Sequence, residues 1–285
     1  MKQIVTLSGK GGTGKTTVLG SFAALAGDTV LADCDVDAAN LYLLLHPQPE
    51  RTGEYRGARI AVRDPARCAQ CGECERRCRF DAITVEAVSA AACEGCGLCV
   101  LACPREALTL QTVVNGVLYE GMTTYGPMVH ARLSPAAENS GRLVTVVRQR
   151  AEEVARRTGR SLILMDGPPG IACTATASLV DTDLAVIVTE PSLSGMHDMA
   201  RVVQLAEQLR VPMAAIINKA DINPDNAADI AEFCASRNIP LLASLPFEEV
   251  VVKANAAQIP LVEYDDGPVS QGLRKAWERI WGLAG

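Results

Sequence analysis

The sequence predicts an α/β protein: a doubly wound, mostly parallel sheet that is interrupted by a small cysteine-rich segment. Three observations predict this fold class. Short apolar runs alternate with helical patterns on both sides of the cysteine-rich segment, which is typical of a parallel sheet with helices on both faces. A glycine-rich loop directly follows the first apolar run. A doubled run of cysteines then separates the first two expected strands from the others.

The first expected element is a strand over Gln3–Leu7, followed by the loop SGKGGTGKTT and a helix over Thr16–Ala26. Glycines let backbone N–H groups converge on an anion. Lys15 can reach the β- and γ-phosphates, and the Thr16 hydroxyl can hold Mg²⁺. The alternative is a glycine-rich turn without a ligand. The loop matches the phosphate-binding pattern G-x-x-x-x-G-K-[ST] at Gly9, Gly14, Lys15 and Thr16.

Lys10 stands one position after the first glycine of this pattern, giving K-G-G-T-G-K-T. The loop resembles the deviant P-loop of the MinD/ParA/Mrp family of ATPases. In that family the early lysine reaches across a sandwich dimer to the partner's nucleotide, so the resemblance implies ATP, Mg²⁺ and an ATP-dependent homodimer, with Lys10 and Lys15 in catalysis. A solvated surface lysine is the alternative for Lys10. The resemblance implies ATP contacts from Gly9, Lys10, Gly11, Gly12, Thr13, Gly14, Lys15, Thr16 and Thr17.

The second expected strand, Thr29–Ala32, leads into the acidic segment DCDVDAANL. Carboxylates at the end of a parallel strand face the ligand crevice of an open α/β sheet. The segment resembles the family's switch I, which implies that Asp35 orients the attacking water while Asp33 and Asp37 support Mg²⁺. An acidic, solvated loop is the alternative.

The cysteine-rich segment contains two copies of C-x2-C-x2-C-x3-C, and the second copy ends in C-P. This is the run of bacterial ferredoxins, in which the fourth cysteine of each run ligates the other cluster. The repeat extends beyond the ligands, since FDAI after the first run parallels REAL after the second. Zinc is the alternative. We expect an inserted domain over residues 57–113, within an ATPase domain of residues 1–56 and 114–285. The predicted [4Fe-4S] ligand sets are Cys68, Cys71, Cys74 and Cys103, and Cys78, Cys93, Cys96 and Cys99.

After this segment the strand and helix patterns resume. The dipeptide Asn115-Gly116 between β-rich residues predicts a tight hairpin. Later patterns predict further strands and two long helices. The expected strands are Gly126–Leu133, Ser161–Met165, Thr182–Val188, Met213–Ile217 and Pro240–Ala243, and the expected helices are Leu143–Arg157 and Gly195–Leu209.

Polar residues follow three of these strands. Asp166, in the segment DGPPG, suits an aspartate that holds Mg²⁺, and the segment resembles the family's switch II. Asn218 matches the family residue that binds the adenine edge, beside Lys219, although a simple turn is the alternative. The loop containing Pro246 and Phe247 resembles the family's second base-contact segment. The expected Mg²⁺ site therefore draws on Thr16, Asp33, Asp35 and Asp166.

Cys173 lies shortly after Asp166. In the related nitrogenase iron protein a cysteine at this distance ligates a cluster shared across the dimer. Only one of the two cysteines that each subunit contributes there is evident here, since Cys34 lies in switch I instead. Buried free cysteine is the common alternative.

The C-terminal segment, Gln271–Leu283, carries an apolar stripe of helical spacing with both tryptophans of the chain. We expect this helix to pack on the sheet, although a membrane-binding amphipathic helix is the alternative. The stripe consists of Leu273, Trp277, Ile280 and Trp281.

The composition of the chain limits the partners and the cellular compartment that we expect. The net charge of −6 gives no general footprint for nucleic acid. No apolar run approaches the ~20 residues that span a bilayer, and the N-terminus enters a strand directly, so we expect a cytoplasmic protein without a signal peptide. Eleven cysteines in a reducing compartment predict metal ligands rather than disulfides.

Three functions remain open. The first is an ATP-gated redox protein that passes electrons through two [4Fe-4S] clusters to a partner protein. The second is an iron–sulfur cluster carrier or assembly scaffold of the Mrp type. The third is a MinD/ParA-like spatial organiser whose clusters only stabilise the fold. Crossed four-cysteine ligation favours the first, because a carrier needs labile, exposed ligands.

Overall fold

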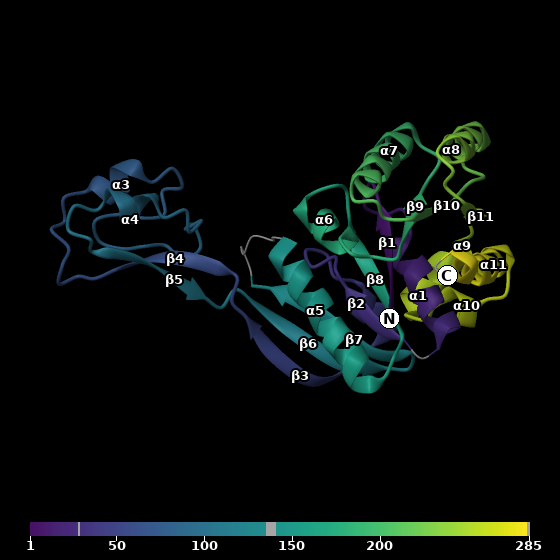
Figure 1. Ribbon diagram of the computed structural model, residues 1–285, viewed down its shortest axis with the longest axis horizontal. Coiled ribbons are helices and arrows are strands. Elements are labelled where there is room, and N and C mark those ends of the chain that lie inside the picture. The colour runs from purple at the N-terminus through teal and green to yellow at the C-terminus, as the bar shows by residue number, and fades with distance from the viewer. Residues whose placement is uncertain (28, 135–140, 284–285) are drawn as a thin grey trace. The chain divides into compact units, whose positions relative to one another are not determined.

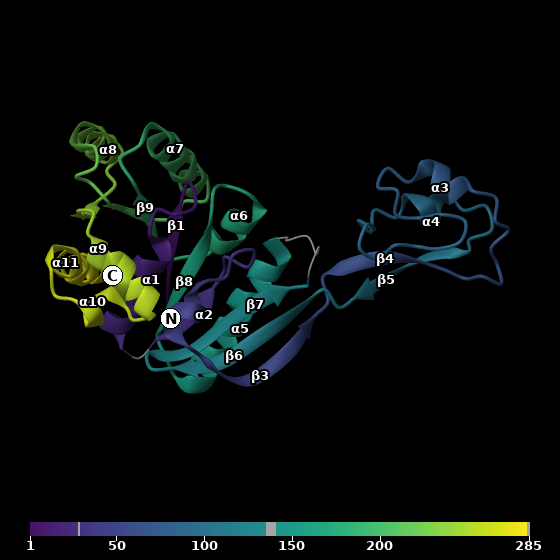
Figure 2. The same cartoon turned by 180° about the vertical axis from the view of Figure 1, so that it is seen from behind.

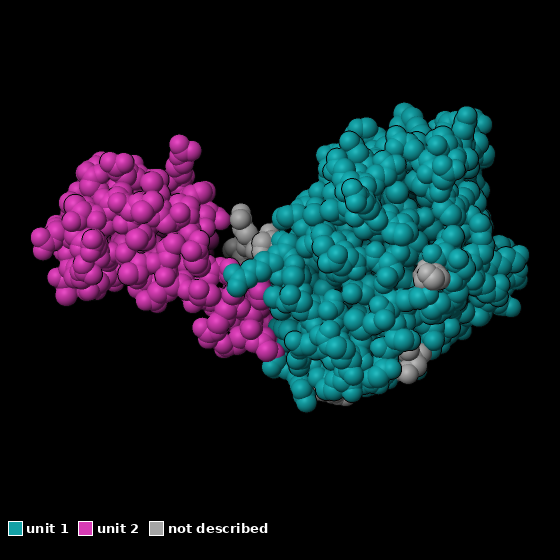
Figure 3. Space-filling view, in the orientation of Figure 1, with its two compact units in different colours: residues 1–52, 118–132, 139–285 teal, residues 53–117, 133–138 magenta. Residues whose placement is uncertain are grey.

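The computed structural model describes residues 1–27, 29–134 and 141–283. The chain divides into two compact units, coloured separately in Figure 3. The sheet unit comprises Met1–Thr52, Leu118–Arg132 and Asn139–Gly285, and the cysteine unit comprises Gly53–Val117 and Leu133–Glu138.

The main sheet has the strand order β11-β10-β9-β1-β8-β2-β7-β6-β3. The strands from β11 to β7 pair in parallel: Ile4 of β1, for example, lies opposite Leu164 of β8 and Leu184 of β9. This confirms the predicted α/β class. The strands are β1 (Lys2–Ser8), β2 (Val30–Asp33), β3 (Gln48–Tyr55), β6 (Gly116–Thr123), β7 (Gly126–Leu133), β8 (Leu162–Pro169), β9 (Leu184–Thr189), β10 (Met213–Ile217) and β11 (Leu241–Ser244).

The tight hairpin is not at Asn115-Gly116, so that prediction is wrong. Asn115 follows β5 of a separate two-stranded sheet and precedes β6 of the main sheet. Its side-chain oxygen accepts a hydrogen bond from the Gly57 N–H at 2.7 Å, so the residue closes a loop instead of a hairpin. The hairpin joins β6 to β7 through Thr124 and Tyr125, a connection that only antiparallel neighbours allow.

Helices cover both faces of the main sheet (Figures 1 and 2). One face packs Ile4, Leu164 and Val186 against Phe22 and Trp277. The alternate residues of the same strands are also fully buried, as a sheet covered on both sides requires. The first face carries α1 (Lys15–Ala26), α2 (Leu41–Leu45), α9 (Glu249–Ala257), α10 (Leu261–Tyr264) and α11 (Pro268–Leu283), and the second carries α5 (Gly141–Thr158), α6 (Cys173–Leu179), α7 (Leu193–Gln208) and α8 (Pro224–Ser236).

The C-terminal helix α11 packs on this core, as predicted. Leu273, Trp277 and Ile280 are buried, and the Trp277 ring lies 5.3 Å from that of Phe22. Trp281 is 45% exposed and contacts Trp277 edge-on. Within the described residues, no helix is both long and apolar enough to cross a membrane.

The cysteine unit contains a second sheet, in which β4 (Ala58–Arg63) runs antiparallel to β5 (Leu108–Val113). Two short helices, α3 (Glu73–Arg77) and α4 (Leu98–Ala102), occupy matching places in the two cysteine runs. The backbone repeats as well, because each helix begins after a left-handed glycine, Gly72 at φ 74° and Gly97 at φ 79°. The sequence repeat is therefore also a structural repeat.

Candidate functional site

Residues 9–14 form a tight loop between β1 and α1, at the carboxyl end of the sheet's central strands. Gly14 caps α1 with φ 98°, and a Cβ there would lie 2.5 Å from the Asn218 amide nitrogen. A Cβ on Gly9 would lie 2.3 Å from that of Asp198. Both positions therefore require glycine. Gly11 has open space around it, so the loop is tight at its two ends.

The two residues predicted to bind phosphate and Mg²⁺ begin helix α1. Lys15 is 7% exposed, and its Nζ lies 3.8 Å from Oδ2 of Asp35. The Thr16 hydroxyl donates a hydrogen bond of 2.6 Å to Oδ2 of Asp166. The structure thus brings together the predicted lysine, hydroxyl and carboxylates from β2, β8 and α1. Thr17, one position on, shares a hydrogen bond with Asn255 of α9.

Three buried carboxyl groups lie at this edge of the sheet, and two of them contact Lys15 or Thr16. Asp33, the last residue of β2, lies opposite Asp166 of β8, while Asp35 follows Asp33. Burial raises the pKa of all three carboxyls, most strongly that of Asp33, and the charge of Asp166 raises the Asp33 pKa further. Lys15 opposes the rise at Asp35 and Asp166. Such a set favours a proton or a bound cation.

Asp33 already has hydrogen-bond partners on both oxygens. Oδ1 accepts from the Asp35 N–H and Oδ2 from the Leu41 N–H, each at 3.1 Å. Asp33 therefore fixes the two ends of the acidic segment. Among the described residues, no three His, Cys, Asp or Glu side chains converge as ligands of a single metal ion.

Lys10 is not a free surface lysine. Its Nζ lies 2.7 Å from Oε1 of Glu190 and donates to the hydroxyls of Ser192 and Ser194 at 3.0 and 3.1 Å. The other oxygen of Glu190 accepts from Lys219 at 3.0 Å. Although burial opposes it, hydrogen bonds from the two lysines hold the pKa of Glu190 below its usual range. Glu190 therefore holds the Lys10 ammonium group in an ion pair within its own chain.

Sequence reasoning assigned no role to Glu190 or to the serines after it. The sequence signal for these residues is weak, because they lie in an ordinary strand end and helix cap, Thr189-Glu190-Pro191-Ser192. Ser192 does cap α7, accepting from the Gly195 N–H. Their contact with Lys10 joins segments that are distant in the chain, so only the fold reveals it.

The predicted base-contact residues lie in two loops that hydrogen bond to each other. The Asn218 side-chain amide donates to the Thr13 carbonyl at 2.8 Å, and Lys219 donates to that of Gly12 at 3.1 Å. The Phe247 N–H donates to Asp221 at 2.6 Å. Phe247 is 47% exposed, and the neighbouring Pro246 is half-buried. Asn218 and Lys219 therefore tie the predicted base-contact loops to the loop over residues 9–14.

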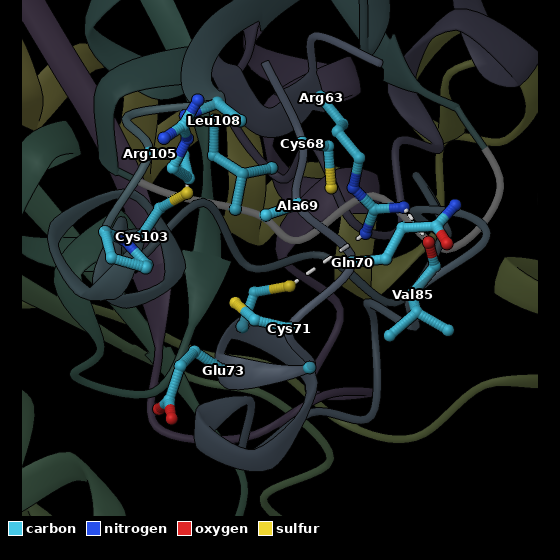
Figure 4. A pocket seen from close by; sticks show the side chains of 14 residues that line it. Arg63, Cys68, Ala69, Gln70, Cys71, Glu73, Val85, Cys103, Arg105 and Leu108 are labelled. Atoms are coloured by element: carbon cyan, nitrogen blue, oxygen red, sulfur yellow. Dashed lines mark hydrogen bonds between the residues drawn. The ribbon is translucent and has the colours of Figure 1, made fainter. Parts of the chain in front are cut away.

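The eight cysteines of the two runs line two separate pockets. Figure 4 shows the first pocket, into which Arg63 projects from β4. Arg63 also donates to the carbonyls of Thr84 and Val85, and its Nη2 lies 4.0 Å from the sulfur of Cys74. The first pocket is lined by Cys68, Cys71, Cys74 and Cys103, and the second by Cys78, Cys93, Cys96 and Cys99.

Backbone N–H groups point at several of these sulfurs. The Ala82 N–H donates to Cys78 Sγ at 3.4 Å, and the Ala107 N–H donates to Cys103 Sγ at 3.3 Å, at the same place in the repeat. The Ala61 N–H donates to Cys93 Sγ at 3.4 Å. Such donors stabilise thiolate charge and are a means of tuning iron–sulfur centres.

The other three cysteines lie in the sheet unit. Cys34 is fully buried, and burial raises its pKa far above the usual range. Cys234 is buried in α8, where burial raises its pKa to about 11. Cys173 is exposed at the first residue of α6. Cys34 and Cys234 are therefore core residues, and Cys173 alone of the three lies on the surface.

Some known proteins resemble this chain along nearly its whole length, and others resemble about a third of it. An uncharacterized protein of Methanocaldococcus jannaschii is 30% identical over 98% of this chain and 96% of its own. The septum site-determining protein MinD of Neisseria meningitidis is 25% identical over 99% and 91%. The cytosolic Fe-S cluster assembly factor Nubp1 homolog of Drosophila grimshawi is 29% identical over 33% of this chain and 37% of its own.

Solved structures show the same fold. The cell division ATPase MinD of Pyrococcus furiosus covers 99% of this chain and 100% of its own, with a TM-score of 0.61 and 21% identity. MinD of Pyrococcus horikoshii, complexed with Mg-ADP, gives a TM-score of 0.57 at 22% identity, covering 100% and 98%. Residues 4–261 match the profile of the CobQ/CobB/MinD/ParA nucleotide binding domain. With its phosphate loop, its paired carboxylates and this match, the chain belongs to the CobQ/CobB/MinD/ParA family of nucleotide-binding domains.

Proposed function

We propose that this nucleotide-binding protein is a Mg²⁺-dependent ATPase that forms an ATP-dependent homodimer and passes electrons to a partner protein through two [4Fe-4S] clusters. The observation that carries the redox part is the division of eight cysteines into two pockets. Each pocket takes three cysteines from one run and the fourth from the other. That is the crossed ligation of two-cluster ferredoxins. In this proposal, residues 57–113 form a ferredoxin-like insert in the ATPase domain.

The cysteine pockets fit such clusters in donor chemistry. Each offers four sulfur ligands, and backbone N–H donors already point at Cys78, Cys93 and Cys103. When bound, a [4Fe-4S] cluster supplies one-electron transfer at a reduction potential that its surroundings set. The protein's own part is to hold the thiolates, donate to their sulfurs and limit access of water.

The nucleotide site fits ATP and Mg²⁺. Lys15 and the N–H groups of the loop would hold the phosphates, while Thr16 and Asp166 would hold Mg²⁺ directly or through water. Asp35, beside Lys15, is placed to orient water at the γ-phosphate. A bound cation also offsets the cost of burying Asp33, Asp35 and Asp166 together. Its positive charge stabilises the ionised carboxylates in place of the water that burial removes.

Dimerisation requires a change at Lys10. In this conformation Glu190 and two serines hold its ammonium group within the chain. For Lys10 to reach a partner's nucleotide, these contacts must break. We infer that Glu190 opposes dimerisation until ATP offers Lys10 a stronger anion. Cys173, exposed on α6, would serve as a ligand shared across that dimer only if a second cysteine approached it.

Cluster delivery is the second candidate, favoured by one observation. The Drosophila relatives, which match about a third of this chain, are named as cytosolic Fe-S cluster assembly factors. A scaffold would transfer iron and sulfide to an acceptor, whereas a redox protein keeps its iron and exchanges electrons. The two functions therefore predict different fates for the iron.

The test begins with anaerobic reconstitution. We expect about eight iron atoms per chain, EPR signals of two reduced clusters, and electron transfer to an acceptor protein with the iron retained. Iron transfer to an apo-ferredoxin would instead support delivery, and tetrahedral zinc with little iron would reject both.

The nucleotide half has its own variants. We expect Lys15→Ala to abolish ATP binding and Asp35→Ala to bind ATP but hydrolyse it slowly. Lys10→Ala should bind ATP without dimerising. Glu190→Gln should dimerise at a lower ATP concentration, while Glu207→Gln, which alters an exposed ion pair with Arg237, should behave as the wild type. Light scattering with and without ATP measures dimer formation, and unchanged dimerisation of Lys10→Ala would reject the cross-dimer role.

A further inference from the structure

The internal repeat allows the surroundings of the two cysteine pockets to be compared position by position. At three matching positions of the repeat, the residue near the first pocket is charged and the residue near the second pocket is apolar and exposed. Glu73 of α3 matches Leu98 of α4, and Arg76 of α3 matches Leu101 of α4. Leu98 and Leu101, three residues apart, share one face of α4. Arg105, which lines the first pocket, matches Phe80, which lines the second.

The three apolar residues form what we call the apolar rim: Phe80, Leu98 and Leu101. They are 45%, 41% and 87% exposed. Phe80 and Leu98 line the second pocket, and Leu101 lies one turn after Leu98 on α4. At each of these places the matching residue of the other copy of the repeat is charged, so the repeated backbone accepts a charged side chain there. Exposure of three large apolar side chains is therefore not imposed by the fold, and clustered exposed apolar groups mark interaction sites.

The charges beside the apolar rim indicate the kind of partner. Arg77 and Arg79 line the same pocket, and Arg79 has no ion-pair partner elsewhere in the described chain. Glu94 is the one acidic residue of this lining, and it has an interaction of its own. The border of the rim is thus net positive. An apolar centre with a charged border is the general pattern of a protein interface, and the border selects a partner of opposite charge.

We propose that the apolar rim is the docking surface for an acidic one-electron carrier protein, which approaches the second cysteine set rather than the first. This inference rests on the proposed redox function. In the exchange, a reduced carrier gives up one electron and one cluster accepts it, with no bond made or broken. Electron-transfer complexes use small interfaces that dissociate readily, which agrees with a patch of three apolar residues and two arginines.

The test uses a reduced flavodoxin, an acidic one-electron carrier, with the reconstituted full chain at low ionic strength. The variant Leu101→Glu alters the residue of the apolar rim that does not line the pocket, where a carboxylate removes apolar surface and repels an acidic carrier. We expect its reduction by flavodoxin to be at least tenfold slower, with unchanged reduction by dithionite and unchanged iron content. The matched control is Arg76→Gln at the equivalent position of the first run, which changes the net charge by the same amount, leaves the ion pair of Glu73 with Arg77 in place and should stay within twofold of the wild type.

Calorimetric titration with oxidised flavodoxin provides a second measurement, because it detects binding without electron transfer. It should be lost in the rim variant and kept in the control. Wild-type rates in the rim variant, an equal loss in the control, or no flavodoxin binding to the wild type would each overturn the docking proposal. A chain that takes up no iron but binds flavodoxin through the rim would overturn the redox function and leave the docking surface supported.

Discussion

The two units of the chain are stabilised in different ways. In the sheet unit, every residue of β2 and β9 is buried, and helices cover both faces of the sheet. In the cysteine unit, few described apolar side chains are buried: Tyr55, Ala61, Ala82, Ile83, Ala107 and Leu108. A unit of this size usually needs disulfides or metal in addition to its core. The sheet unit can therefore fold by burial of apolar surface, whereas we expect the cysteine unit to depend on a group that its thiols bind.

The largest expected effect is the selective unfolding of the cysteine unit. Removing iron anaerobically with a ferrous chelator should abolish amide-exchange protection in β4 and β5, because metal binding supplies folding free energy there. Protection in β1 and β8 should remain. Cys96→Ala should act in the same direction, while Cys234→Ala, which removes a buried thiol from the sheet unit, should leave β4 and β5 protected. Equal protection with and without iron would contradict the comparison.

The next effect tests the core of the sheet unit. Trp277 is 7% exposed and packs on Phe22. Trp277→Ala removes this packing and should lower the free energy of unfolding by about 3–5 kcal/mol. Chemical denaturation followed by far-UV circular dichroism measures it. The iron content should not change, since the two units are stabilised independently. Loss of iron in this variant would show that they are not.

Most of the sheet unit was predictable from sequence, because its signals are local. The loop over residues 9–14, the end of β2 at Asp33 and the part of β8 around Asp166 each combine a motif with its element. The loop at Asn115 was not predictable, since its local N-G signal favours a hairpin whereas the Asn115 side chain binds Gly57 from another part of the chain. The clamp of Lys10 by Glu190 is equally non-local. The grouping of the cysteines into two pockets agrees with the spacing rule, because each run repeats one backbone conformation.

A smaller effect comes from the buried carboxyls of the sheet unit. Their pKa values are raised, so the folded protein binds protons more readily than the unfolded chain does. Without Mg²⁺ and nucleotide, the free energy of unfolding should therefore decrease as the pH rises from about 4 through the raised pKa values, and level off above them. Urea titrations between pH 5 and 8 measure this. Mg-ADP should stabilise most at the upper end, because a cation replaces the protons. Burial lowers the pKa of His130 to about 4, which by itself makes the free energy of unfolding rise with pH up to about 6.5. The wild type is therefore compared with Asp33→Asn, and a wild-type curve that falls no more steeply than that of the variant would contradict the assignment.

The smallest expected effect separates the two tryptophans of α11. Trp281 contacts Trp277 edge-on at 5.5 Å between ring centroids, and the Lys2 ammonium lies 5.9 Å from its ring, yet the side chain is 45% exposed. Trp281→Ala removes these two contacts and little buried area, so it should cost only about 1 kcal/mol. Lys2→Met, which deletes the cation alone, should cost less than half as much. If α11 bound membranes, Trp281→Ala would instead reduce co-flotation with anionic liposomes. We expect neither the wild type nor the variant to float with liposomes, because the apolar stripe faces Phe22 and the sheet. If Trp281→Ala lowered the free energy of unfolding as much as Trp277→Ala, α11 would pack differently from the structure described.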